Sequence, residues 1–131
     1  MNKGFTLIEA LIAIFVLTIG ISAVLTMFPF GLQVGNFSQM TTMASQLAQA
    51  KTEEIVSKSY SDISLGTIIE DPLDSPFESF SRETEVTYVD SSLEYSAVET
   101  GLKKVKITVS FNSSLKISKK SVEIITLIAE R

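Results

Sequence analysis

The pattern of hydrophobic and polar positions begins with one long apolar stretch. From Ala10 to Ala50 there is no charged side chain, and the part up to Phe28 is almost wholly apolar. A helix of about 20 such residues crosses a hydrocarbon core of about 30 Å. The apolar side chains surround the helix axis, as in a helix that faces lipid or other apolar helices on every side. Residues 5–32 are therefore predicted to form a membrane-spanning helix.

A proline lies near the end of this helix, in Phe28-Pro29-Phe30-Gly31. Proline removes one backbone donor and clashes with the preceding helical turn. We therefore expect a kink at Pro29, or local melting between about Leu25 and Gly35.

Residues 33–60 change to an amphipathic helical pattern. Apolar positions at helical spacing predict one buried face, with the stem of Lys51 alongside, and polar positions between them predict a face in water. The expected buried residues are Phe37, Met40, Ala44, Leu47, Ala48 and Ile55, and the expected exposed ones are Gln39, Thr42, Gln46, Glu53 and Ser57. We interpret this half of the helix as the platform for a sheet.

Residues 61–131 are predicted to form the loop and sheet of a small head. Gly66, Pro72 and Pro76 punctuate a long loop from Ser61 to Ser81, and Ile68-Ile69, Phe77 and Phe80 are expected to pin it to the head.

Three stretches in this region have the pattern of strands. Alternation predicts two half-buried strands, one with Thr84, Val86 and Tyr88 inward and one with Val105, Ile107, Val109 and Phe111 inward. Ser121–Ala129 is apolar on both faces and predicts a last strand partly covered on both sides.

Asp90–Gly101 connects the first two strands, with Leu93–Val98 as a possible short strand. A turn is expected at Asn112-Ser113-Ser114, and Leu115–Ile117 could extend the ladder. The fold class is thus α+β, a long N-terminal helix on an antiparallel sheet of about three to four strands.

Charge is distributed unevenly over the head. Residues 62–99 hold ten acidic side chains and one basic one, whereas residues 103–131 hold seven basic and two acidic ones. Pairing across the strands, with Glu83 and Glu85 opposite Lys104 and Lys106, accounts for part of this pattern. The alternative is a dipolar head that docks head-to-tail on neighbouring subunits.

Composition excludes several classes of site. The chain has no cysteine and no histidine, so disulfides, the usual zinc sites and His- or Cys-based catalysis are absent. With 11 basic and 15 acidic side chains, the net charge of −4 disfavours nucleic-acid binding through a generally basic surface. Glu70, Asp71 and Asp74 supply the oxygens that calcium prefers, but their spacing matches no known loop and favours solvated acids. We expect no metal, no cofactor, no small-molecule substrate and no enzymatic activity.

One carboxylate, Glu9, lies near the start of the apolar segment. An unpaired charge within a membrane span costs at least about 2.5 kcal/mol on insertion scales, so such residues tend to be functional. Only a short stretch that contains Lys3 precedes the apolar segment.

The stretch Gly4-Phe5-Thr6-Leu7-Ile8-Glu9 after this short leader resembles the class III signal of type IV pilin-like proteins. The resemblance implies that residues 1–4 are a leader, that a prepilin peptidase cuts after Gly4, and that the new N-terminus at Phe5 is N-methylated. Glu9 becomes the fifth residue of the mature chain. Its carboxylate could then neutralise the new amine, in the same or a neighbouring subunit, as an assembly ion pair.

The resemblance also implies a setting. The protein would be a single-pass inner-membrane protein with an extracytoplasmic head, and its helix would join other pilins or pseudopilins in a pilus or type II secretion filament. Within the family, the sequence is most similar to the minor pilin V group and to secretion pseudopilin I.

Other interpretations are a DNA-uptake pseudopilin, an ordinary secretory signal cut near Gly20-Ile21-Ser22, and a plain membrane anchor. A secretory signal would have Glu9 inside its apolar core, which counts against it. The DNA-uptake interpretation depends on a lysine patch formed by Lys103, Lys104, Lys106, Lys116, Lys119 and Lys120, which lacks interleaved aromatic residues beyond Phe111.

Overall fold

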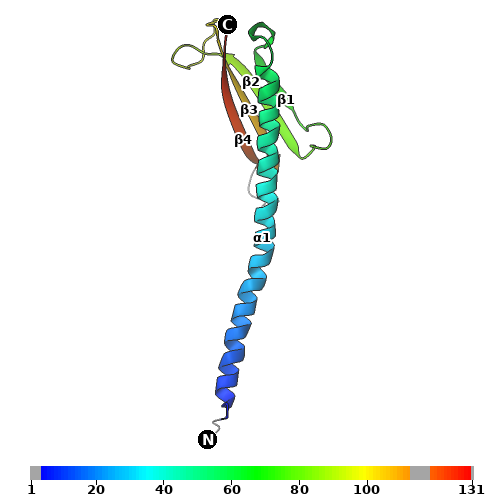
Figure 1. Ribbon diagram of the computed structural model, residues 1–131, viewed down its shortest axis with the longest axis vertical. Coiled ribbons are helices and arrows are strands. Elements are labelled where there is room, and N and C mark those ends of the chain that lie inside the picture. The colour runs from blue at the N-terminus through cyan, green and yellow to red at the C-terminus, as the bar shows by residue number, and fades with distance from the viewer. Residues whose placement is uncertain (1–3, 113–118, 131) are drawn as a thin grey trace. The chain divides into compact units, whose positions relative to one another are not determined.

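The computed structural model describes residues 4–112 and 119–130 and has an α+β architecture (Figure 1). Helix α1 (Leu7–Val56) is followed by a short 3-10 turn, η1 (Tyr60–Asp62), and four strands. The strands are β1 (Gly66–Glu70), β2 (Phe80–Tyr88), β3 (Leu102–Asn112) and β4 (Lys119–Ala129). The predicted fold class, a long N-terminal helix packed on an antiparallel sheet, is confirmed. Parts of three predictions lie outside the described residues. These are residues 1–3 of the predicted leader, Ser113 and Ser114 of the expected turn, and Leu115–Ile117 as an extension of the ladder.

The chain forms two compact units, residues 1–36 and residues 37–131. We call them the N-terminal unit and the head. Helix α1 supplies the described helix of the N-terminal unit and continues into the head, where it ends at Val56 rather than at Tyr60.

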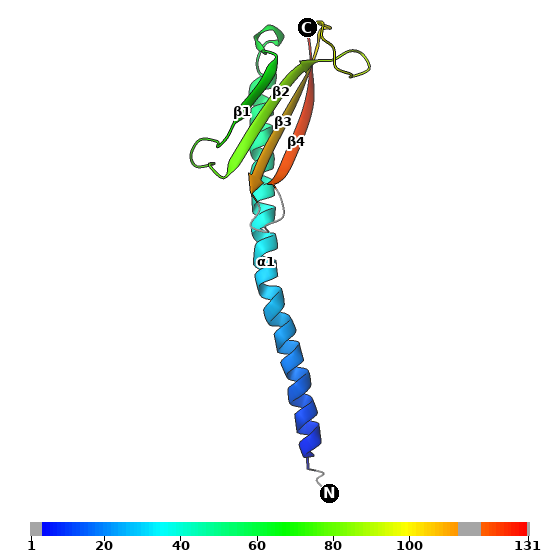
Figure 2. The same ribbon diagram turned by 180° about the vertical axis from the view of Figure 1, so that it is seen from behind.

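Within the head, α1 lies across one face of the sheet (Figure 1 and Figure 2). Ala44, Ala48 and Ile55 are buried, and Phe37, Met40 and Leu47 are half-buried against the same core. The polar positions expected to face water are exposed. The predicted amphipathic face is therefore confirmed.

The sheet is antiparallel, with strand order β1-β2-β3-β4. Its inner face, which packs on α1, follows the predicted alternation in β2 and β3. Thr84 and Val86 are buried on β2, and Val105, Ile107, Val109 and Phe111 are buried on β3. At one end of this core the Phe111 ring lies 6.1 Å from the ring of Phe37 and 5.8 Å from that of Phe80.

A fifth inward residue of β3 is a lysine. Lys103 is in phase with Val105 and only 4% exposed. Its Nζ donates to the backbone oxygens of Tyr60 at 2.7 Å and Ile63 at 2.8 Å and lies 4.0 Å from the centre of the Tyr60 ring. The ammonium is therefore buried with hydrogen-bond acceptors and an aromatic face, and it fastens η1 to the sheet.

Strand β1 corrects the expectation of an uninterrupted loop from Ser61 to Ser81. Residues 66–70 pair with Arg82–Val86 of β2. Ile68 and Ile69 do not pin this segment to the core, because they are 60% and 68% exposed. Phe77 and Phe80, by contrast, pack on the core as expected.

The expected short strand at Leu93–Val98 is absent from the described residues. The segment contributes a single isolated bridge between Val89 and Tyr95, and turns and bends occupy most of the rest. Asp90 organises this loop, because its side-chain oxygen accepts from the backbone N–H groups of Ser92 and Glu94.

One of the two expected cross-strand charge pairs forms. Glu85 lies opposite Lys106, with 2.9 Å between their charged atoms. Glu83 lies opposite Thr108, and Lys104 lies opposite Thr87, so the expected Glu83–Lys104 pair is wrong. The antiparallel register moves those two residues apart, and a pair between Glu70 and Arg82 forms between β1 and β2 instead.

Strand β4 is covered on one face only. Val122, Ile124 and Ile128 pack on the core, whereas Ile125 and Leu127 are 55% and 44% exposed. The expectation of cover on both faces is wrong because no described element lies over the outer face of the sheet.

Candidate functional site

The residues singled out by the signal resemblance lie at the beginning of α1. Gly4 and Phe5 precede the helix, and Phe5 is 82% exposed. Thr6 caps the helix: its carbonyl accepts from the N–H of Ala10 at 3.2 Å, and its Oγ1 accepts from the N–H of Glu9 at 3.4 Å. Glu9 is therefore at the third helical position, inside the first turn.

This geometry gives Glu9 a local role that the sequence analysis missed. A threonine followed three residues later by a glutamate is the capping-box pattern, and a negative charge in the first turn also opposes the positive end of the helix dipole. The signal was present in Thr6-Leu7-Ile8-Glu9. Glu9 thus occupies the position of a capping-box residue, and its charge in the first turn favours the helix start through the dipole.

Gly4 meets no structural requirement for glycine. A Cβ built at this position finds no atom within 4 Å. Within the described chain, a side chain at position 4 is therefore tolerated. Any need for glycine there would come from another protein that recognises this segment.

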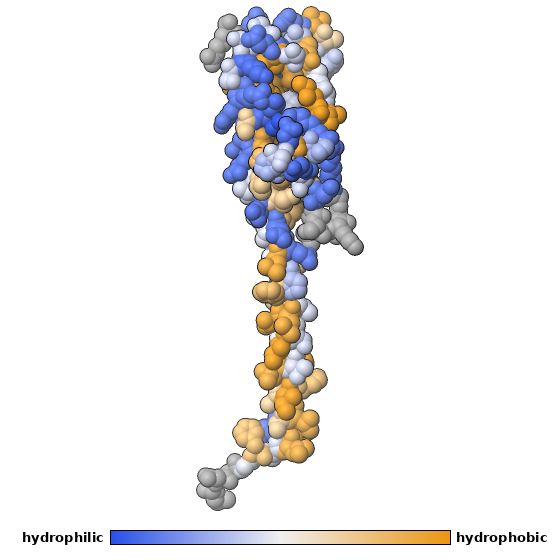
Figure 3. Space-filling view, turned by 90° about the vertical axis from the view of Figure 1, so that its right-hand side faces the viewer, coloured by the Kyte–Doolittle hydropathy of each residue, from blue (hydrophilic) through white to orange (hydrophobic). Residues whose placement is uncertain are grey.

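The side chains of α1 in the N-terminal unit face outward without cover. The large hydrophobic residues from Leu7 to Val34 are 45% to 81% exposed, and Figure 3 shows hydrophobic side chains dominating this helix on the face in view. The helix contains an 18-residue window of mean hydropathy 2.6 that is 0% buried. By length and composition this is a helix that could cross a membrane.

The polar side chains in this apolar surface are satisfied within the helix itself. The hydroxyls of Thr18, Ser22 and Thr26 donate to the carbonyls of Ile14, Thr18 and Ala23 at 2.8, 2.7 and 2.8 Å. Such back-bonding leaves no hydroxyl hydrogen that needs water. The surface therefore suits an apolar surrounding, in which every polar group must find a partner inside the protein.

Helix α1 continues through Pro29, and residues 25–35 are helical throughout. The expected local melting is not present in this structure. Proline removes a single hydrogen bond, and the turns on either side keep theirs. A bend at Pro29 in an assembled state stays a prediction.

The candidate calcium ligands Glu70, Asp71 and Asp74 do not act together, because Glu70 is paired with Arg82. Both carboxylate oxygens of Glu70 accept from Arg82, from Nε and from a terminal nitrogen, at 2.7 Å each. These hydrogen bonds hold the pKa of Glu70 below its usual range. Asp71 and Asp74 are exposed, and no group of three or more metal-ligating side chains occurs in the described part of the chain.

The candidate lysine patch loses a member. Lys103 is buried beneath η1, so it is not available to a phosphate backbone. Lys106 is engaged with Glu85, whose hydrogen bond raises the pKa of Lys106. The basic surface expected for DNA binding is correspondingly weakened.

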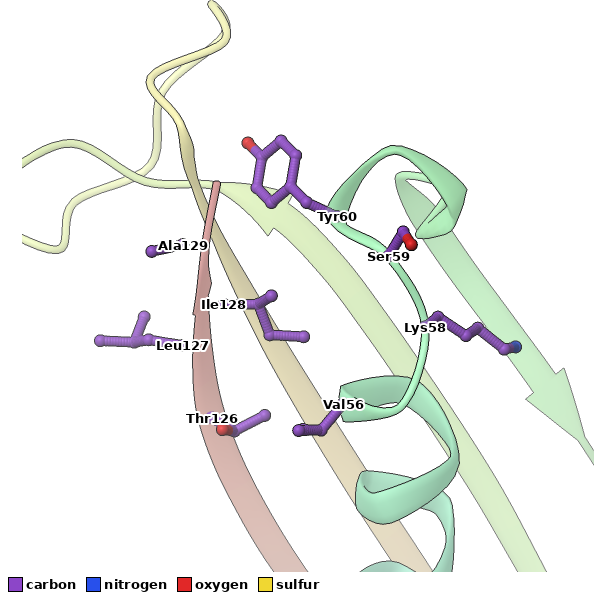
Figure 4. A pocket seen from close by; sticks show the side chains of 8 residues that line it. All are labelled: Val56, Lys58, Ser59, Tyr60, Thr126, Leu127, Ile128 and Ala129. Atoms are coloured by element: carbon purple, nitrogen blue, oxygen red, sulfur yellow. The ribbon is translucent and has the colours of Figure 1, made fainter. Parts of the chain in front are cut away.

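A groove of the head lies between the end of α1 and β4 (Figure 4). It has a volume of about 560 Å³ and is lined by Val56, Lys58, Ser59, Tyr60 and residues 126–129. Val56 points toward β4, and Lys58 points away toward β1 (Figure 4), where its Nζ lies 3.0 Å from a carboxylate oxygen of Glu54. Burial raises the pKa of the Tyr60 hydroxyl. The residues that line the groove other than Lys58 are uncharged.

Comparison with known families bears on the N-terminal segment. Residues 1–25 match the model of the prokaryotic N-terminal methylation motif. The chain carries a pilin-type signal. This match supports a type IV pilin or pseudopilin subunit, a class that assembles with other pilins and associates with membranes. No curated protein and no solved structure matches the chain.

Proposed function

We propose that this protein is a non-enzymatic filament subunit, a minor pilin or pseudopilin of a type IV pilus or type II secretion system. The observation that carries the proposal is the coincidence of three features at one helix end. A methylation motif covers residues 1–25, the helix behind it exposes its apolar side chains, and Glu9 is the only acidic residue in its first turn.

Processing is the first step of the proposal. A prepilin peptidase removes residues 1–4 and methylates the new N-terminus at Phe5. The open space around Gly4 supports a glycine kept for access by the peptidase rather than for packing. The segment before α1 is not helical, so the Gly4–Phe5 bond lies outside the helix.

The assembly ion pair is the second step. Cleavage creates a positive amine at Phe5, about one helical turn from the carboxylate of Glu9. Within the described residues no cation makes a salt bridge with Glu9. An amine from the same or a neighbouring subunit would neutralise this carboxylate and permit both groups to enter an apolar helix bundle.

The setting follows from the same features. The helix is anchored in the inner membrane with the head on the extracytoplasmic side, and the exposed apolar side chains of α1 pack on the equivalent helices of other pilins or pseudopilins. We place the chain in the group of minor pilin V and secretion pseudopilin I.

The two roles of Glu9 can be separated by a pair of substitutions. In Glu9→Gln the side chain retains the length and hydrogen-bonding groups of a capping-box residue but loses the charge, whereas Glu9→Val removes both. We expect both variants to insert in the membrane and to be lost from purified filaments, with incorporation reduced at least about tenfold, a factor that corresponds to about 1.4 kcal/mol.

Incorporation is measured by quantitative immunoblotting of sheared filaments against the membrane fraction. Thr6→Ala is the matched control, because it removes the hydroxyl that caps the helix and leaves the carboxylate. Normal incorporation of Glu9→Gln together with failure of Thr6→Ala would contradict the ion pair and leave Glu9 as a capping residue.

A further inference from the structure

The head has two outer strands, and both carry exposed apolar side chains. In the described residues β1 and β4 each pair with one neighbour only. Ile68 and Ile69 on β1, and Ile125 and Leu127 on β4, are 44% to 68% exposed. Outer strands usually carry features that block pairing with another chain, so apolar side chains on both indicate that these strands have a partner.

The direction of the strands restricts how two copies can meet. With four strands that alternate in direction, β1 and β4 run opposite ways. If a second copy keeps the same orientation, its β1 therefore lies antiparallel to β4 of the first copy, with both α1 segments on the same face of the joined sheet. The inference applies to copies whose heads share this orientation. To that extent it rests on the proposed function, in which equivalent helices anchor all copies in one membrane.

Charge favours the same arrangement. Strand β1 ends in Glu70 and is followed by the exposed Asp71 and Asp74, whereas β4 begins with the exposed Lys119 and Lys120. Antiparallel pairing brings the acidic end of β1 to the basic end of β4. Parallel pairing would instead bring the acidic end of β1 to the end of β4 at Glu130, which is also acidic.

The inner face of β1 carries one of these exposed side chains. Ile68 lies in the same register row as the inward residues Thr84 and Ile107, but at the outer strand it remains 60% exposed. The same row ends at Ile124 of β4, which is half-buried on the inner face. A copy whose β1 adds to β4 along this row would bring its Ile68 beside Ile124.

We propose that a second copy of this chain adds its β1 strand antiparallel to β4, so that the sheet continues head-to-tail from one head to the next. Such an interface is not closed by symmetry and can repeat along an assembly. Because β1 offers only five residues, the contact is smaller than the roughly 1,200 Å² typical of stable soluble complexes. It therefore depends on anchoring, which raises the effective concentration of one head near another.

The test uses the full chain in membranes, where its lack of cysteine makes introduced cysteines unique. Two differently tagged copies are expressed together, one with Ile69→Cys and one with Ile125→Cys, and treated with a short bismaleimide. We expect a cross-linked dimer that carries both tags. Either variant expressed alone should give at most a tenth of that yield.

The control replaces Ile125→Cys by Gln46→Cys, on the exposed side of α1 in the head. Equal cross-linking of Gln46→Cys with Ile69→Cys, same-tag dimers in either single culture at comparable yield, or no cross-link at all would each overturn the proposal.

A charge exchange tests the direction of pairing. Lys119→Glu with Lys120→Glu in the Ile125→Cys copy should lower the yield about fivefold. Adding Asp71→Lys with Asp74→Lys to the other copy should restore it. An unchanged yield, or no recovery in the exchanged pair, would contradict the charge-matched antiparallel arrangement. Failure here with a normally cut and methylated N-terminus would reject the strand pairing and leave the filament function in place.

Discussion

At the scale of single residues, Glu9 and Lys103 are charged groups in surroundings that usually exclude charge. Glu9 lies at the start of an apolar helix, where the dipole and the Thr6 cap stabilise its position in the first turn. Lys103 lies under η1, where two carbonyls and the Tyr60 ring accept its ammonium. The first is available to a partner chain, and the second is fully used within its own head.

Replacing Lys103 by methionine tests this distinction. Lys103→Met keeps much of the apolar stem but removes the ammonium donor from the carbonyls of Tyr60 and Ile63. The Tyr60 carbonyl still accepts from the N–H of Ile63 at 3.3 Å. We expect a loss of about 2 kcal/mol in the free energy of unfolding of the head, measured by chemical denaturation of the detergent-solubilised chain. Lys104→Met is the matched control, because Lys104 faces the other side of β3 and is half-buried. It should change stability by less than about 0.5 kcal/mol. Equal effects of the two variants on the free energy of unfolding would contradict a stabilising role of the buried Lys103 ammonium.

At the scale of elements, the sequence predicted the helix and strands that bury one face and expose the other. The head part of α1 and strands β2 and β3 each bury one face, so their apolar positions recur with a clear period. Strand β1 was missed because Ile68 and Ile69 are both exposed, which removes the alternation that marks a strand. The β-branched run Thr67-Ile68-Ile69 after Gly66 was the remaining signal.

Two further differences between the prediction and the structure concern Glu83 and Lys103. In an antiparallel pair the residue number rises along one strand as it falls along the other, so Glu85 opposite Lys106 requires Glu83 opposite Thr108. The expected pair of Glu83 with Lys104 was incompatible with that register. Lys103 is in phase with Val105, and that phase was the available sign of its burial. The candidate residues Gly4, Phe5 and Glu9 stand out because their motif is local in sequence, and their roles stay predictions.

The last turns of α1 contain a charge cluster that makes the head sensitive to acid. Glu54 accepts from Lys51 at 2.8 Å and from Lys58 at 3.0 Å, and these hydrogen bonds lower its pKa from 4.5 to about 2. The folded head therefore binds fewer protons than the unfolded chain between these values. The stabilisation by Glu54 is fully present above about pH 4.5 and is lost as the pH falls toward 2.

Carboxyl chemical shifts recorded by NMR during an acid titration would measure this pKa directly. In Glu54→Gln, the decrease of unfolding free energy between pH 4.5 and 2 should be shallower than in the parent chain. High salt should reduce the difference because the cluster is on the surface. A Glu54 that titrates near 4.5, or a variant with an unchanged acid slope, would contradict the assignment.

At the scale of the whole molecule, the two units present different surfaces. The N-terminal unit exposes apolar side chains, and the hydroxyls of Thr18, Ser22 and Thr26 donate to backbone carbonyls of the same helix. The head buries its own core and exposes a mixture of charged and apolar positions on its outer strands. Such a chain is suited to assembly, with the helix unit shielded by lipid or other helices and the head unit recognised by its neighbours.

The chemical state of the N-terminus tests this account most directly. The protein is purified from its native membranes, and its intact mass and N-terminal peptide are determined by mass spectrometry. We predict a chain that begins at Phe5 with a methylated amine, and an uncut chain beginning at or near Met1 when Gly4 is replaced by a bulky residue. A mature protein that retains Gly4, begins after Gly20-Ile21-Ser22, or is processed equally well after the Gly4 replacement would contradict the pilin-type assignment.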